Sequence, residues 1–170
     1  MNNSTDHAST FIKRIVISVA TFVMFSSNPA MACSCASKGA FIDYANTSAG
    51  VIHARVLSYG EKLSHGETLY ASMMVEVVAV LAGDLEFDAL VLLGDPGFLC
   101  REYVDSRNFA IGKEYIIAIH NDESVQPFGG CGEAWLAVNN GFVEGFAITK
   151  DGTTRYSMPM RELLEKLANH

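Results

Sequence analysis

The four cysteines of this 170-residue chain are the residues whose type and spacing have the clearest chemical consequence. Cys33 and Cys35 are separated by Ser34 alone, whereas Cys100 and Cys131 stand singly. An even number of cysteines in an exported protein indicates disulfides. A bond between Cys33 and Cys35 is disfavoured because it would close a very tight ring. In an extended segment, residues i and i+2 point to the same side, so both cysteines would face a common partner region. Cys33 and Cys35 are therefore expected to bond separately to Cys100 and Cys131, in either order.

A zinc site is the alternative use of four thiols. Structural zinc sites normally take their thiolates from C-x2-C pairs, whereas this chain has one C-x-C and two single cysteines. The spacing therefore favours disulfides. In the chain-entropy model each bond closes a long loop and stabilises the fold by roughly 4 kcal/mol.

The other reactive residue types form no catalytic pattern. A lone His53 within a strand is typical of a surface or core residue, and His65 and His120 have no second His or carboxylate at ligand spacing. The polar residues 64–67 have nothing to order them, and HExxH, GxSxG and glycine-rich phosphate loops are absent. We therefore expect no enzyme activity and neither a cofactor nor a metal of the protein's own.

The N-terminal segment has the order of a secretory signal peptide. Lys13 and Arg14 precede an uncharged apolar run at 15–25, and the tripeptide 30–32 has the small-x-small pattern of a cleavage site. Cleavage before Cys33 divides the chain into a signal peptide, 1–32, and a mature domain, 33–170. The alternatives are an uncleaved N-terminal anchor and a lipoprotein in which Cys33 is lipidated. The prediction is a secreted protein, extracellular or periplasmic.

Length and charge restrict the mature chain further. The residues from 33 onward suffice for a single domain with a real core. The whole chain has a net charge of −7 and shows no cluster of Lys or Arg, so nucleic acid is not an expected partner. No stretch reaches the roughly 20 apolar residues of a membrane-spanning helix. The oligomeric state does not follow from the sequence.

Strand patterns occupy most of the mature chain. Strands are predicted at 51–59, 68–83, 89–94 and 113–120, a hairpin over 133–148, and a further strand after the turn at 151–152. Within the hairpin, Asn140-Gly141 is the strongest short-range turn signal of the chain. Trp135 and Phe142 of this hairpin are expected to pack against the sheet.

Two short helices flank the strands. Phe41, Tyr44 and Ala45 have i, i+3, i+4 spacing and predict a helix within 38–50. The segment 157–170 predicts a C-terminal helix with Pro159 in its first turn; its apolar face is formed by Met160, Leu163, Leu164 and Leu167. Many short antiparallel strands with few helices imply a small, closed or partly open β-barrel.

Together these features resemble a known family. Five features are similar to the N-terminal domain of the tissue inhibitors of metalloproteinases. They are the C-x-C at the predicted mature N-terminus, the short helix, the strand beginning at Val51, the long strand ending near Gly83 and the segment 109–119. Those inhibitors belong with the netrin-like modules. The resemblance implies a mainly β, OB-fold-like, five-stranded barrel, to which this chain adds a C-terminal hairpin and helix. The chain lacks the third disulfide and second domain of the animal inhibitors, and in this it resembles secreted bacterial proteins of the same superfamily.

The resemblance also implies disulfide pairs and a function. In the family, the first cysteine of the C-x-C pairs with the cysteine after the third strand and the second pairs with the later one. Carried over, this implies the bonds Cys33–Cys100 and Cys35–Cys131. It also implies that Cys33 chelates the zinc of a target metalloprotease and that Ser34 enters the adjacent specificity pocket.

The chemistry of a free N-terminus is compatible with that role. An α-amino group has a pKa of about 7.7–8.0, so part of it is neutral near pH 7 and has a lone pair. With its own carbonyl oxygen, the Cys33 amine forms a five-membered chelate for a zinc ion that has an open coordination position. The alternative is a netrin-like module of the cell envelope that binds a protein or a glycan and whose N-terminus is only structural.

Overall fold

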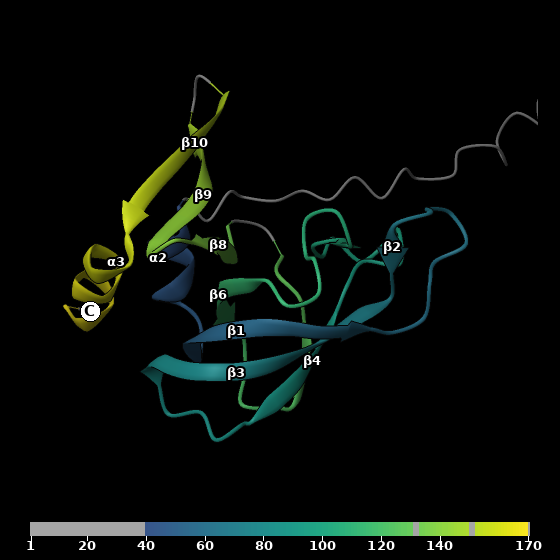
Figure 1. Cartoon of the computed structure of the whole chain (residues 1–170), viewed down its shortest axis with the longest axis horizontal. Helices are drawn as coiled ribbons and strands as arrows, with labels where there is room; N and C mark the ends of the chain where they lie inside the picture. The colour runs from purple at the N-terminus through teal and green to yellow at the C-terminus, as the bar shows by residue number, and fades with distance from the viewer. Residues whose placement is uncertain (1–39, 131–132, 150–151, 170) are drawn as a thin grey trace, which may run out of the picture. The chain divides into compact units, whose positions relative to one another are not determined.

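The computed structural model describes residues 40–130, 133–149 and 152–169, all within the unit Cys33–His170 of the chain (Figure 1). Within this unit the chain is mainly β, as predicted. Among the described helices, none is long and apolar enough to cross a membrane.

Most strands belong to one open sheet. Its order is β10-β9-β8-β6-β1-β3-β4-β7, and β2 and β5 form a separate small sheet. The strands are β1 (Gly50–Tyr59), β2 (Leu69–Tyr70), β3 (Ser72–Gly83), β4 (Ala89–Leu93), β5 (Val104–Asp105), β6 (Glu114–Ile119), β7 (Val125–Pro127), β8 (Trp135–Asn139), β9 (Phe142–Thr149) and β10 (Gly152–Pro159).

The centre of the sheet is β1, which pairs antiparallel with β3 on one side and with β6 on the other. β3 pairs antiparallel with β4, and β4 pairs in parallel with β7. In the part of the chain that the structure describes, β6 and β7 share no ladder, so the sheet remains open there.

Two apolar cores lie on opposite faces of the central strands. Because side chains alternate along a strand, Ile52 of β1 belongs to the first core and Val51 to the second. Burial of one large apolar side chain stabilises the fold by about 1.5–3 kcal/mol. The first core contains Ile52, Ala54, Val56, Met73, Val75, Leu85, Leu90, Leu92, Val104, Phe109, Tyr115, Ile117, Ile119 and Phe128. The second contains Phe41, Tyr44, Ala45, Val51, Ile116, Ala118, Ala134, Leu136, Val143 and Leu163.

The predicted N-terminal helix is present as α2 (Phe41–Ala45). The backbone N–H of Ala40 donates to the Asp43 carboxylate at 3.2 Å, which satisfies one donor at the helix start. The predicted face is confirmed, since Phe41, Tyr44 and Ala45 are all buried in the second core.

The predicted hairpin at Asn140-Gly141 is also confirmed. β8 and β9 pair from Asn139↔Phe142 onward, and both turn residues have positive φ, 49° at Asn140 and 82° at Gly141. This conformation is that of a type I′ turn, which favours Asn-Gly. Trp135 packs against the first core as expected, but Phe142 is 47% exposed and that prediction is wrong. Its neighbour Val143 is the residue that alternation turns into the second core.

One strand prediction needs correction, and two short strands were not predicted. The single strand expected over 68–83 is interrupted at Ala71, whose N–H donates to the Glu61 carbonyl at 2.7 Å. The residues before Ala71 form β2, which pairs with β5 instead of continuing the large sheet. Neither β5 nor β7 was predicted, because both are too short to show a strand period and exist through pairing with distant strands.

The C-terminal helix is α3 (Met160–Ala168), and it begins later than predicted because Pro159 is the last residue of β10. Leu163 is fully buried, and Met160 and Leu167 pack against the second core. Leu164 is 39% exposed, so its assignment to the apolar face is wrong. It is about 100° around the helix from Leu163, outside the stripe formed by i−3, i and i+4.

Candidate functional site

The predicted zinc-chelating tip, Cys33 and Ser34, lies outside the described residues, as do Cys35 and Cys131. Cys100 is described. It is disulfide-bonded and its φ is +55°, in the left-handed region that few non-glycine residues adopt. The partner of Cys100 is not among the described residues, so the pairs Cys33–Cys100 and Cys35–Cys131 remain predictions.

The loop that leads to Cys100 is organised by a buried carboxylate. Asp95 is 5% exposed, and its Oδ1 accepts hydrogen bonds from the backbone N–H groups of Gly97 at 2.6 Å and Phe98 at 2.7 Å. Oδ1 also accepts from Leu99 N at 3.0 Å, and Oδ2 accepts from Arg101 N at 3.1 Å. Four backbone donors on one side chain hold the whole loop in a single conformation.

The charge state of Asp95 follows from this geometry. Burial alone raises its pKa, but the four N–H donors outweigh burial and the pKa lies below its ordinary value. Asp95 is therefore ionised at neutral pH, and each of its hydrogen bonds is charge-assisted.

The tip of this loop presents apolar side chains to solvent. Phe98 is 67% exposed and Leu99 is 43% exposed, immediately before the disulfide-bonded Cys100. An apolar pair on a loop held by a buried carboxylate and a disulfide loses little conformational entropy on docking. We call residues 95–100 the Asp95 loop.

A second carboxylate fixes the start of α2. Glu133 Oε2 accepts from the backbone N–H of Phe41 at 3.0 Å and from the Tyr156 hydroxyl at 2.6 Å, and its Oε1 accepts from Phe146 N. Burial raises the pKa of Glu133, against the lowering effect of these three donors. Burial, followed by the hydrogen bond to Glu133, raises the pKa of Tyr156. The carboxylate thus ties α2, β9 and β10 together.

The third polar cluster faces outward from β1, β3 and β6. Glu114 accepts from His53 Nε2 at 2.9 Å and from Arg55 Nη2 at 2.7 Å, and Arg55 Nη1 donates to Glu76 at 2.9 Å. The Arg55 guanidinium is the main reason that the pKa of Glu114 is lowered. His53 is therefore held in a surface chain of polar contacts with Glu114, Arg55 and Glu76. Among the residues that the structure describes, no group of three or more His, Cys, Asp or Glu is placed to hold a metal ion.

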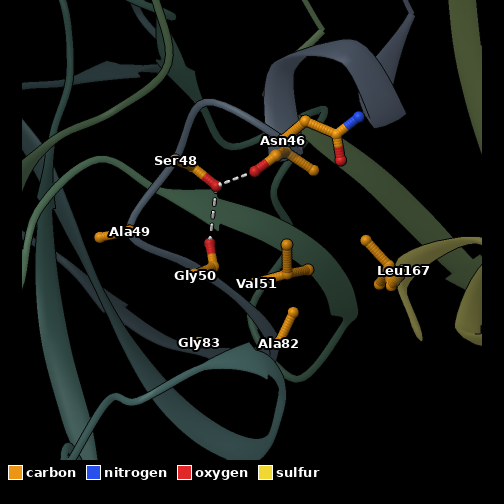
Figure 2. A pocket seen from close by; sticks show the side chains of 9 residues that line it. Asn46, Ser48, Ala49, Gly50, Val51, Ala82, Gly83 and Leu167 are labelled. Atoms are coloured by element: carbon orange, nitrogen blue, oxygen red, sulfur yellow. Dashed lines mark hydrogen bonds between the residues drawn. The ribbon is translucent and has the colours of Figure 1, made fainter. Parts of the chain in front are cut away.

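One hollow of about 290 Å³ lies between the end of α2, the start of β1 and α3 (Figure 2). The Ser48 hydroxyl lies 2.6 Å from the Ala45 carbonyl and 3.1 Å from the Gly50 carbonyl. The rest of the lining is mostly small or apolar, with Asn46 at the rim and Leu167 on the α3 side. None of the lining residues is titratable, so the hollow has no acid or base for chemistry.

Comparison of the chain with protein-family models, with curated proteins and with solved structures finds no match. The resemblance to netrin-like modules therefore remains an expectation from the residues.

Proposed function

We propose that the protein is a secreted inhibitor of zinc metalloproteases that acts through the free amine and carbonyl of Cys33. The observation that carries the proposal is the Asp95 loop, which presents Phe98 and Leu99 beside a disulfide-bonded Cys100. Protein interfaces are dominated by a few rigid apolar anchors, and this loop has that form.

The arrangement of strands supports the proposal at the level of the fold. Strands β6, β1, β3, β4 and β7 are neighbours in that order, and the large sheet is open between its β7 edge and β6. A five-stranded, partly open barrel is the architecture of an OB-fold, which the resemblance implies. The hairpin β8–β9, strand β10 and helix α3 are then additions at one edge.

The zinc belongs to the target and the protein needs no cofactor. Signal cleavage would leave Cys33 with an α-amino group that is partly neutral near pH 7. Its nitrogen and carbonyl oxygen would occupy the open position of a catalytic zinc and displace the water that the protease uses. Ser34 would enter the adjacent pocket of the protease.

The Asp95 loop would extend this contact. A Cys33–Cys100 bond, as the resemblance implies, puts Phe98 and Leu99 within two residues of the cysteine that is bonded to the chelating tip. The loop would then supply apolar contact area beside the zinc site. The second candidate function, a non-inhibitory netrin-like module that binds a protein or a glycan, is supported by the same exposed pair, because Phe98 and Leu99 suit a protein partner without zinc.

The test begins with the state of the N-terminus. Intact-mass analysis of the secreted protein should give the mass of residues 33–170 with a free amine; an uncleaved, lipidated or acetylated form would exclude chelation. The protein is then assayed against a panel of zinc proteases beside a variant that has one extra Ala before Cys33. Loss of inhibition in the extended form supports the mechanism, whereas inhibition that survives the extension contradicts it.

A second pair of variants tests the loop. Phe98→Ala should weaken inhibition by roughly tenfold or more, the lower range for an interface anchor. Ile111 is 59% exposed in a different turn, so Ile111→Ala is the matched control and should leave inhibition unchanged. If neither the wild type nor any variant inhibits a protease, the binding-module function is favoured.

A further inference from the structure

A groove runs along the face of β8, β9 and β10 that is not covered by the helices. Two adjoining hollows of about 230 and 280 Å³ lie there and share the lining residues Arg107, Asn108, Ala137 and Glu144. Its lining comes from these three strands, from residues 107–113 and from Glu114 and Tyr115 of β6. We call it the β8–β10 groove; its side chains with hydrogen-bonding, charged or aromatic groups include Arg107, Asn108, Lys113, Trp135, Glu144 and Arg155.

The strand period explains why this face is open. Leu136, Val143 and Tyr156 point to the second core beneath α2 and α3. Their neighbours in the sequence point to the other side of the same strands, where no helix of the described chain packs (Figure 1). The hairpin and β10 therefore bury one face in the second core, while on the opposite face Trp135 and Ala137 pack against the first core and also line the groove.

The cationic groups of the groove are held in place. Arg107 Nε lies 3.0 Å from both carboxylate oxygens of the buried Asp105, and Nη2 lies 2.5 Å from Oδ2. This guanidinium holds the pKa of Asp105 well below its usual range. The other nitrogen of the guanidinium, Nη1, has no partner within the described chain. On β10, Arg155 lies opposite Phe146 in the ladder, with its guanidinium carbon 5.3 Å from the ring centroid.

An aromatic ring lies between these cations and the core. Trp135 makes edge contacts with Phe109 and Tyr115, at centroid distances of 4.7 and 5.8 Å, and its side chain is hydrogen-bonded to Glu102. These contacts fix the orientation of the indole. Since Trp135 is only half-buried and lines the groove, part of the ring remains available to a ligand.

The acidic groups narrow the class of ligand. The Glu114 carboxylate at the rim is occupied by Arg55 and His53, and the Asp105 carboxylate by Arg107. Glu144 remains as an acceptor inside the groove, and Lys113 has no ion pair among the described residues. A polyphosphate would place a charge next to Glu144, whereas a sugar can place a hydroxyl there and a carboxylate beside the guanidinium groups.

We propose that the β8–β10 groove binds a short acidic oligosaccharide, a chain of sugar rings that carry carboxylates. Arg107, Arg155 and Lys113 bind the carboxylates, Asn108 and Glu144 bind ring hydroxyls, and the indole of Trp135 contacts the apolar face of a ring. The lining has three cationic side chains, Arg107, Lys113 and Arg155, and two carboxylates, of which Glu114 is paired with Arg55 outside the groove. The cations therefore outnumber the unpaired carboxylate, although the chain as a whole has a net charge of −7. The groove consists entirely of described residues outside the predicted inhibitory tip, so the inference does not depend on the proposed function.

Trp135 makes the test direct, because it is the one tryptophan of the chain. Titration of the protein with trigalacturonate should change its fluorescence, and calorimetry should give the same dissociation constant. Arg155→Ala and Lys113→Ala should each weaken binding by about tenfold, because each removes one charge-assisted contact from the groove. Arg161→Ala removes the same charge from an exposed position on α3 and should leave the affinity unchanged.

Three results would overturn the proposal. The first is the absence of both a fluorescence change and calorimetric heat with trigalacturonate at millimolar concentration. The second is equal binding of a neutral galactose trisaccharide, which would show that the cations do not select the ligand. The third is tighter binding of a pentaglutamate peptide, which would reassign the groove to an acidic protein segment. Far-UV circular dichroism of each variant separates lost binding from lost folding.

Discussion

Asp95→Asn is the substitution for which the structure gives the clearest expectation. The amide retains one oxygen, which can keep the three bonds to Gly97, Phe98 and Leu99. The amide N–H₂ group takes the place of Oδ2, which accepted a hydrogen bond from the backbone N–H of Arg101. The Arg101 N–H then faces a second donor and loses its acceptor. An unsatisfied donor costs about 1–3 kcal/mol, and loss of the charge roughly halves the strength of the remaining bonds.

We therefore expect Asp95→Asn to lower the free energy of unfolding by about 3 kcal/mol, a large part of the roughly 5–15 kcal/mol of a typical domain. With a urea m-value of about 2 kcal/mol/M, the midpoint should fall by about 1.5 M. Trp135 fluorescence and circular dichroism follow the transition under non-reducing conditions. Hydrogen exchange should become faster at the amides of Gly97, Phe98, Leu99 and Arg101.

The pH dependence gives an independent check. The folded pKa of Asp95 is lowered, so its stabilising effect is complete above the unfolded pKa of about 3.9 and is lost as the pH falls through the folded pKa. The wild type should therefore lose stability in acid more steeply than Asp95→Asn. Asp88→Asn, at an exposed carboxylate, is the control and should change stability by less than about 0.5 kcal/mol. If Asp95→Asn matches that control and the loop amides exchange as before, the reasoning is refuted.

Further predictions concern the other two carboxylate clusters. Glu133→Gln leaves one of its three donors facing an amide N–H₂ and should destabilise the fold by about 1–3 kcal/mol in urea; an unchanged midpoint would exclude the role of Glu133 in joining α2 to β9 and β10. Gly145→Ala should cost about 1–3 kcal/mol, because the added Cβ would meet Glu133 Oε1 and the Leu136 side chain; a neutral effect would show that these groups shift freely. Glu114 has a pKa lowered chiefly by Arg55, so its contribution is present above about pH 4.3 and is lost in acid. In Glu114→Gln the free energy of unfolding should therefore fall less steeply as the pH is lowered below about 4.3. The same steepness in the variant and the wild type would contradict this.

The elements that could be predicted are those with a strong local signal. The i, i+3, i+4 spacing of Phe41, Tyr44 and Ala45 sets both the helix and its buried face. Asn140-Gly141 predicts the hairpin because both residues tolerate positive φ. In each case a few neighbouring residues decide the outcome, so the surrounding fold is not needed.

The elements that were missed depend on distant partners. β7 has three residues, ends in Pro127, and exists as a strand through parallel pairing with β4. The break at Ala71 arises because Tyr70 pairs with Val104 of β5. The exposures of Phe142 and Leu164 were predicted wrongly because hydrophobicity alone does not say which of two adjacent apolar residues faces the core.

The sequence by itself determined the mainly β class, since strand patterns depend on composition and local spacing. The secretory segment is a prediction from the order of charged, apolar and small residues, and the candidate role of Cys33 and Ser34 comes from the resemblance to the metalloproteinase inhibitors. Only the tertiary structure decided which polar residues organise the protein. The residues Asp-Pro-Gly at 95–97 are typical of a turn, but the four bonds to the Asp95 carboxylate are visible only in the folded chain. No local pattern marks Glu133, whose three donors come from segments far apart in the chain. The β8–β10 groove is likewise a product of packing. Burial of one face of the hairpin leaves the opposite face open, and only the folded chain brings Arg107 and Arg155 to the same surface.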